Sequence, residues 1–180
     1  MEIILATKRW DETDRIRSIF NGFKVPLKNA EEAGITGVIP HDERLSPQER
    51  VETKAFSLHA WLAEKKWIIA NETGIFTSDP TKGFIECAFS AEEETRAFFR
   101  TYVFLLGPRD EKFFFISDVP GTLYQHPHCE PWPNVPCSAC FQPDGKQKVW
   151  AEMGFEEETE TLFRPRAFYD AKEFLNKYHY

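Results

Sequence analysis

Residues 68–76 read IIANETGIF and place one carboxylate, that of Glu72, between two apolar segments. Asn71 and Gly74 tolerate positive φ and Thr73 can hydrogen-bond locally, so one interpretation of this stretch is an ordinary turn. The other interpretation is that the turn presents Glu72 to a metal ion, or to a water molecule that it deprotonates. This short stretch by itself is compatible with both.

A second group of reactive side chains lies in residues 126–140, HPHCEPWPNVPCSAC. His128, Cys129, Cys137 and Cys140 are of the residue types that bind zinc tetrahedrally, and the last two have Cys-x-x-Cys spacing. The remaining spacing is not that of a standard zinc finger, so free thiols in a loop are the alternative. A bound zinc ion would cross-link this loop through its ligands.

The composition is that of a globular protein: 180 residues, 42% hydrophobic, with 17 phenylalanines. The formal net charge of −7 argues against a general affinity for nucleic acid or for anionic membranes. No segment has the apolar length of a membrane span, and the N-terminus lacks the layout of a signal peptide. We therefore expect a cytoplasmic protein whose cysteines are thiols.

Helical and strand patterns alternate along the chain, which predicts the α/β class with a mixed sheet. Ser46, Pro47 and Glu49 predict a helix start with a capping box. Further helices are expected over 11–20, 90–98 and 167–178. Extended or strand segments are expected over 2–6, 23–27, 34–39 and 67–70, together with a hairpin of strands 99–107 and 111–119 joined by 108–110.

Four blocks of the sequence resemble, in order, the motifs of one enzyme family. IILATKRWDETDRI resembles a strand followed by Thr-x-Asn-x-x-Lys and a helix, and SPQERVETKA resembles Glu-Asn-Ala-x-x-Lys-Ala. IIANETGI resembles Ala-Asp-Asp-Ser-Gly-Leu, and ACFQPDGKQKVWAEM resembles Pro-x-Phe-x-Pro-Asp-Gly-x-x-Lys-Thr-Phe-Ala-Glu-Met. The family is that of the inosine/xanthosine triphosphate pyrophosphatases, and the resemblance extends over nearly the whole chain.

The resemblance implies an elongated two-lobed α/β fold, with a long mixed sheet flanked by helices and a central cleft. It implies one domain over 1–180, with a hairpin lobe over roughly 99–142. The implied reaction is Mg²⁺-dependent hydrolysis of a non-canonical purine nucleoside triphosphate to the monophosphate and pyrophosphate by an activated water. Relatives of this kind are typically homodimers, and the surplus of phenylalanine allows an apolar interface.

The resemblance also assigns roles at the metal end of the site. Glu72 matches the second Asp of the Asp-Asp pair, which activates water near the metal, and Asn71 matches the first, without its charge. Glu49 matches a metal-binding Glu, although its capping role explains it equally well. Lys54 matches a phosphate-binding Lys; as a lone helical lysine it could also be simply solvated.

Further phosphate ligands are implied at Thr7 and Lys148, with Lys8 and Arg9 as neighbouring cations. Glu12 stands where the family has a phosphate-binding Lys, and this reversal of charge opposes triphosphate binding.

Nucleobase contacts are implied at Trp132, Phe141 and Arg166. Arg166 matches an Arg of the family's Ser-His-Arg motif only after a shift of one residue, and the Ser and His are absent. A tryptophan in a proline-rich loop also serves plain packing. The alternative to an active enzyme is thus a catalytically degenerate relative that binds a nucleotide or a protein.

Overall fold

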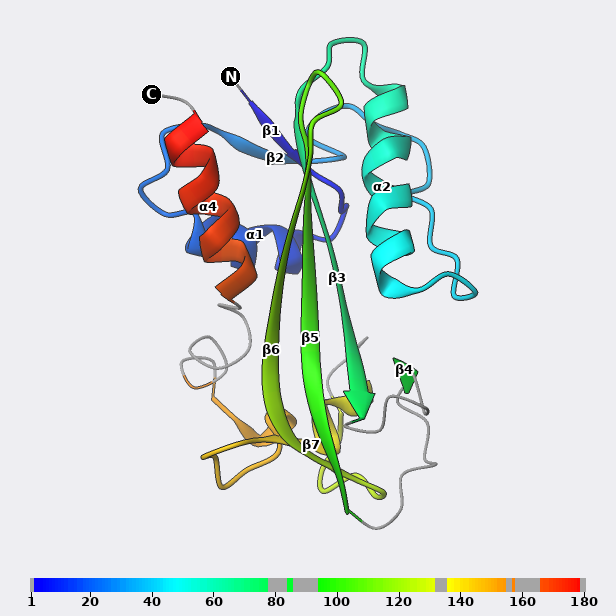
Figure 1. Ribbon diagram of the computed structural model, residues 1–180, viewed down its shortest axis with the longest axis vertical. Coiled ribbons are helices and arrows are strands. Elements are labelled where there is room, and N and C mark those ends of the chain that lie inside the picture. Colours follow the sequence, from blue (N-terminus) through cyan, green and yellow to red (C-terminus); the bar gives the residue numbers. More distant parts are fainter. Residues whose placement is uncertain are drawn as a thin grey trace. The chain divides into compact units, whose positions relative to one another are not determined.

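The computed structural model describes residues 2–77, 84–85, 94–131, 136–154, 157 and 166–178 (Figure 1). Its helices are α1 (Trp10–Ile19), α2 (Pro47–Trp61) and α4 (Arg166–Tyr178), with two short 3₁₀ turns at Pro136–Ala139 and Trp150–Glu152. Its strands are β1 (Ile3–Leu5), β2 (Leu27–Asn29), β3 (Trp67–Thr77), β4 (Phe84–Ile85), β5 (Glu94–Leu106), β6 (Lys112–Tyr124) and β7 (Phe141–Pro143). None of the helices within these ranges combines the length and the apolar character needed to cross a bilayer.

The described strands form one sheet in the order β2-β1-β3-β5-β6-β7, with β4 paired to β3. β1 runs parallel to both β2 and β3, whereas β3 with β4 and β6 with β7 are antiparallel. The α/β class with a mixed sheet, predicted from the sequence, is therefore confirmed.

Contacts within the chain divide it into two units. The first comprises Met1–Glu72, Thr101–Ile116 and Arg166–Tyr180, and the second comprises Thr73–Arg100 and Ser117–Pro165. β3, β5 and β6 each contribute residues to both units. The hairpin lobe expected over roughly 99–142 stays a prediction.

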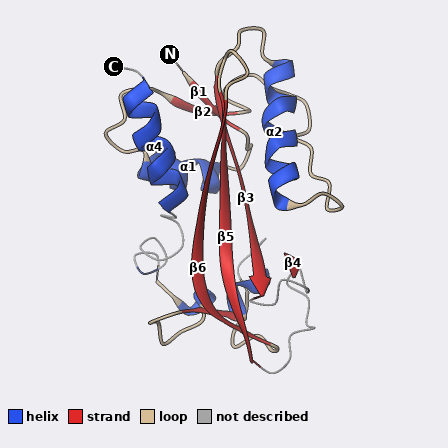
Figure 2. Cartoon of the chain, viewed as in Figure 1, coloured by secondary structure: helices blue, strands red, loops and turns tan. Residues whose placement is uncertain are grey.

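In the first unit, helices cover both faces of the strands (Figure 2). Trp67 and Ile69 of β3 pack into one apolar core with Ile16 of α1 and Leu175 of α4. Glu72, three residues beyond Ile69, bonds to α2 instead. Since successive strand side chains alternate between faces, α2 covers the face opposite to α1 and α4.

α2 begins as the sequence predicts. The Ser46 side chain accepts a hydrogen bond from the Glu49 N–H, and the Glu49 carboxylate accepts one from the Ser46 N–H, with Pro47 as the first helical residue. This reciprocal pair satisfies two backbone donors that a helix start otherwise leaves open.

At the start of β1, Glu2 is held between two lysines of flanking segments. Its carboxylate lies 2.6 Å from Lys28 Nζ in β2 and 2.6 Å from Lys66 Nζ, directly before β3. These hydrogen bonds lower the pKa of Glu2, so the carboxylate is ionised in the folded protein.

The second unit has its own apolar core around Phe99, Phe141 and Trp150. Phe99 and Trp150 meet edge to face with ring centroids 4.4 Å apart. Gly121 of β6 lies against β7 so closely that a Cβ atom there would come within 2.6 Å of the Phe141 ring. Only glycine fits this approach of backbone to ring.

Two predicted elements differ in the structure. Residues 94–98, part of the helix expected over 90–98, begin β5, while 90–93 lie outside the described residues. Ala97 and Phe99 are buried and Arg96 is exposed, so the burial alternates with a strand's period of two. The second difference concerns the extended segments: 34–39 forms no strand, and 23–27 reaches β2 only at Leu27. The predicted helices 11–20 and 167–178 are confirmed within one residue at each end.

Candidate functional site

The turn expected at 71–74 does not form, because β3 continues without interruption from Trp67 to Thr77. Asn71 and Glu72 consequently point to opposite faces of the strand. Asn71 Nδ2 donates to Glu12 Oε1 of α1 over 2.9 Å, and Glu72 Oε1 accepts from Lys54 Nζ of α2. Polar partners on both faces outweigh the local turn preference of Asn-Glu-Thr-Gly.

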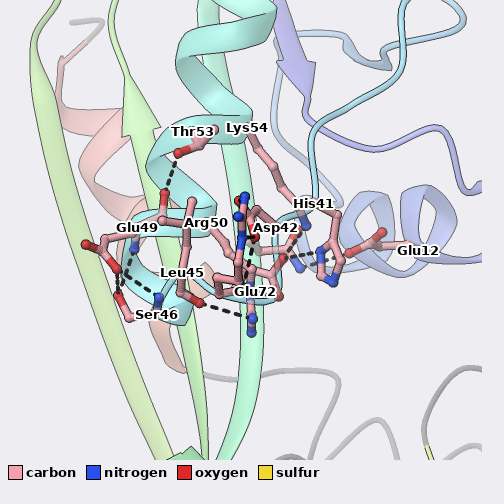
Figure 3. Close-up of polar contacts among 12 residues, drawn as sticks. Glu12, His41, Asp42, Leu45, Ser46, Glu49, Arg50, Thr53, Lys54 and Glu72 are labelled. Carbon is pink, nitrogen blue, oxygen red and sulfur yellow. Dashed lines mark hydrogen bonds and ion pairs between the residues drawn. The ribbon is translucent and has the colours of Figure 1, made fainter.

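On the α2 face, Glu72 is surrounded by three cationic or ionisable nitrogen groups (Figure 3). Besides Lys54, His41 Nδ1 lies 3.5 Å and Arg50 Nε 3.9 Å from its carboxylate oxygens. Glu72 is only 9% exposed and Arg50 only 4%. A carboxylate this buried requires such partners, because an unpaired buried charge is strongly unfavourable.

On the α1 face, both oxygens of the Glu12 carboxylate are engaged. Oε2 accepts from Thr7 Oγ1 over 2.6 Å, and Oε1 accepts from Asn71. The Arg9 N–H donates to the same Thr7 hydroxyl over 3.1 Å. These contacts link the residues that follow β1 to the first turn of α1 and to β3.

Glu49 lies away from this group. Its carboxylate faces Ser46 and accepts from the Ser46 N–H and hydroxyl over 2.8 and 2.7 Å, so Figure 3 shows it directed away from Glu72. The hydrogen bonds from Ser46 lower the pKa of Glu49. The structure thus shows the capping role of Glu49 and does not bring its carboxylate together with that of Glu72.

The implied Mg²⁺ ion needs several oxygen ligands in near-octahedral geometry. Around Glu72 the neighbouring polar groups are nitrogen donors, and Glu49 is bound to its own helix start. Within the described ranges, no three His, Cys, Asp or Glu side chains are grouped so that they could hold a metal. The described side chains alone thus do not complete a ligand set for Mg²⁺. The Mg²⁺ requirement stays a prediction, which the metal dependence of the activity tests.

Several solved structures share this architecture over nearly their whole length. The Staphylococcus aureus Ham1 protein superposes with a TM-score of 0.76 at 15% identity, covering 98% of this chain and 99% of that one. A HAM1 protein from Coxiella burnetii gives 0.74 at 13% identity, covering 98% and 99%. A nucleoside-triphosphatase, a dITP/XTP pyrophosphatase from Mycobacterium abscessus, gives 0.68 at 15% identity, covering 95% and 98%. The chain has the Ham1 fold.

The resemblance drawn from the sequence is therefore confirmed at the level of the Ham1 fold. No family model matches the sequence, and no curated protein matches it significantly. Since the identities are at most 15%, the likeness establishes the fold, and the residues of the site must be assessed individually.

The predicted phosphate ligands are spread over the two units of the Ham1 fold. Thr7 is buried and bound to Glu12, Lys8 Nζ donates to the Thr36 carbonyl over 3.1 Å, and Lys54 is bound to Glu72. The Arg9 guanidinium is held by Asp11, with 2.6 Å between Nη2 and Oδ2. Lys148 belongs to the second unit, where its Nζ lies 3.8 Å from Glu157.

The predicted nucleobase contacts are divided between the two units, and one of them lies outside the described residues. Phe141 is completely buried in the core of the second unit, so its side chain packs rather than lines an open pocket. Arg166 begins α4 in the first unit with 86% of its side chain exposed, 3.7 Å from Asp170. Trp132 lies outside the described residues.

The predicted zinc ligands show no arrangement of a closed site. Cys140 is buried in the apolar core, Cys137 packs against it, and the His128 ring contacts the Tyr124 ring at 4.4 Å. Burial and the negative charge of Glu152 raise the pKa of the Cys129 thiol. Zinc stays a prediction, and elemental analysis of the purified protein tests it.

Sequence reasoning missed His41 and Arg50 as partners of Glu72. Arg50 and Lys54 are four residues apart, a spacing that places both side chains on one face of α2. That spacing was visible in the sequence, but its target on β3 was not. His41 lies in the loop before α2, where no sequence pattern indicated a contact with β3.

Proposed function

We propose that this protein hydrolyses nucleoside triphosphates to nucleoside monophosphate and pyrophosphate, with non-canonical purine nucleotides as its substrates. The Ham1 fold over the whole chain supports a nucleotide hydrolase, because the structures that share it include a dITP/XTP pyrophosphatase. The observation that carries the proposal is the contact between Glu72 and Lys54, which come from two separate blocks of the sequence and meet across β3 and α2.

In the proposed reaction, water attacks a phosphorus atom of the triphosphate chain and pyrophosphate leaves. Glu72 is the candidate base that accepts the proton of this water, and Lys54 is the candidate partner of the phosphate oxygens. His41, 3.5 Å from the Glu72 carboxylate and itself exposed, is placed to exchange that proton with solvent. A bound Mg²⁺ ion, which the resemblance implies, would neutralise charge on the phosphate oxygens in this step.

A second candidate function is nucleotide binding without turnover, or binding of a protein. It is favoured by the α1 face, where Glu12 and Asn71 replace the charged pair that the resemblance implies. Such a chain would retain the fold but release its nucleotide unchanged.

An assay of pyrophosphate release separates the two. The protein is incubated with ITP, XTP, dITP and the ordinary nucleotides, with Mg²⁺ and with a chelator. Turnover that falls about 10²–10⁴-fold in Glu72→Gln supports the hydrolase, which is the range for loss of a general base. Glu173→Gln, which removes an exposed carboxylate of α4, is the control.

Absence of turnover in every condition rejects the hydrolase, whereas full turnover in Glu72→Gln rejects Glu72 as its base. A nucleotide-dependent rise in the unfolding temperature without any turnover supports the binding module instead.

A further inference from the structure

Glu12 occupies a position in the first unit where hydrogen-bond donors from two strands converge. β1 and β3 are parallel neighbours, with Leu5 opposite Ile69, and Thr7 and Asn71 each follow this pair by two residues. The Thr7 hydroxyl and the Asn71 amide both donate to the one carboxylate. The parallel pairing of β1 with β3 ends at Leu5 and Ile69, although β3 itself continues to Thr77. The two donors thus lie directly beyond the carboxyl end of this parallel pairing, the end at which open α/β sheets bind ligands.

The Thr7 hydroxyl and one N–H of the Asn71 amide are occupied by this internal anion. The Thr7 side chain is 7% exposed, so its hydroxyl has little access to solvent, and its hydrogen bond to Glu12 is short for a neutral donor at 2.6 Å. The nearby Arg9 guanidinium is bound to Asp11 rather than turned to a ligand. A phosphate oxygen entering here would have to displace a carboxylate and would face its charge.

We propose that Glu12 is a specificity-determining residue that disfavours the phosphate chain of a nucleotide by filling the Thr7 and Asn71 donors with its own carboxylate. The inference rests on the proposed function and deepens it. The protein binds a nucleoside triphosphate less tightly, relative to the monophosphate of the same nucleoside, than it would with an uncharged residue at position 12. Glu12 acts on the ligand by charge and by occupancy, and takes no part in the proton transfer assigned to Glu72.

The predicted change is a gain in affinity for ITP, whereas a variant that folds poorly would lose affinity. Glu12→Gln removes the charge and keeps the side-chain length, and Glu12→Lys reverses the charge. Asp14→Asn is the matched control, since it removes a negative charge from the same helix at a side chain that is 71% exposed. Dissociation constants for ITP and IMP are measured by calorimetry for the four proteins, with Mg²⁺ and with a chelator.

We expect ITP to bind about tenfold more tightly to Glu12→Gln than to the wild type, and more tightly still to Glu12→Lys, because a like charge at the contact is removed or reversed. IMP affinity and the Asp14→Asn protein should change little. Thermal unfolding of each protein shows that the comparison is made on folded chains, and Glu12→Gln alone suffices if Glu12→Lys does not fold.

Three outcomes overturn the inference. If Glu12→Gln binds ITP no more tightly than Asp14→Asn does, Glu12 does not control phosphate affinity. If Glu12→Gln binds ITP more weakly, Glu12 is a ligand or metal residue instead. If none of the four proteins binds ITP, the proposed function fails together with the inference. If the wild type turns over ITP and Glu12→Gln binds ITP with unchanged affinity, the inference alone is refuted.

Discussion

Asn71 and Glu72 are adjacent in the chain, yet their side chains bond to helices on opposite faces of β3. Asn71 donates to Glu12 of α1, and Glu72 accepts from Lys54 of α2. Two residues that the sequence predicts to be one catalytic pair therefore belong to two separate hydrogen-bond networks. A double-mutant cycle on Glu12 and Lys54, one residue from each network, measures how strongly β3 couples the two.

The ion pair between Lys54 and Glu72 should show strong coupling. Lys54→Met leaves the buried Glu72 carboxylate with one cation fewer, so we expect the free energy of unfolding to fall by about 1–3 kcal/mol. Adding Glu72→Gln removes the charge left behind, so the double variant should lose less than the sum of the two single variants. Urea denaturation of the four proteins completes the cycle, and strictly additive losses would show that the contact contributes nothing.

The capping box of α2 offers a test of Glu49. Ser46→Ala removes the side chain that caps the helix and should lower the free energy of unfolding by about 1 kcal/mol. Glu49→Gln keeps an acceptor for the Ser46 N–H, so both stability and pyrophosphate release should stay near the wild-type values. A folded Glu49→Gln protein without turnover would show that this carboxylate has a role beyond the cap.

His59 should make stability depend on pH near neutrality. It is buried on α2, and its Nε2 finds no hydrogen-bond partner among the residues that the structure describes. Burial, followed by the charge of Lys65, lowers its pKa, although the Asp110 carboxylate lies 3.3 Å from Nδ1. The unfolded chain, with a His pKa of about 6.5, binds this proton more readily than the folded one, so stability falls as the pH drops through that value.

His59→Gln should remove this dependence of stability on pH. Thermal unfolding between pH of about 7.5 and 5.5 measures it, a range chosen because the carboxyl groups with lowered pKa titrate below it. An equal loss of stability in the variant would assign the slope to another group.

Phe141 should behave as a core residue rather than as a nucleobase contact. Since it is fully buried, Phe141→Ala should lower the free energy of unfolding by about 3–5 kcal/mol. Phe141→Leu should cost far less and leave nucleotide affinity unchanged. Gly121→Ala should also be destabilising, because its Cβ would press on the Phe141 ring. A specific loss of ITP binding in a stable Phe141→Leu protein would reverse this assignment.

Local signals predicted much of the fold. Ser46, Pro47 and Glu49 fixed the start of α2 because capping uses backbone groups within four residues, and the apolar spacing around Ile16 and Leu175 identified α1 and α4. The strand over 94–98 was missed because Glu94 and its neighbours have helical preference, while the pairing that makes them a strand comes from residues distant in the sequence.

The sequence predicted several residues of the candidate site, but it did not predict how their side chains are arranged. Glu72 and Lys54 were paired with the same site from motifs, and they do meet. Glu49 and Asn71 were assigned to it too, but Glu49 is turned to its local cap and Asn71 faces α1 because β3 continues as a strand where a turn was expected. His41 and Glu12 acquire their contacts only when α1, the loop before α2 and β3 are brought together.

The position of Glu2 makes the start of β1 sensitive to the protonation of one carboxylate. One carboxylate balances two ammonium groups, Lys28 and Lys66, on the segments to either side. Acidification through the lowered pKa of Glu2 therefore breaks both ion pairs at once and leaves two like charges facing a neutral acid. The two segments that carry Lys28 and Lys66 lose their shared counter-ion in that one event, so we expect acid to weaken the first unit from this point.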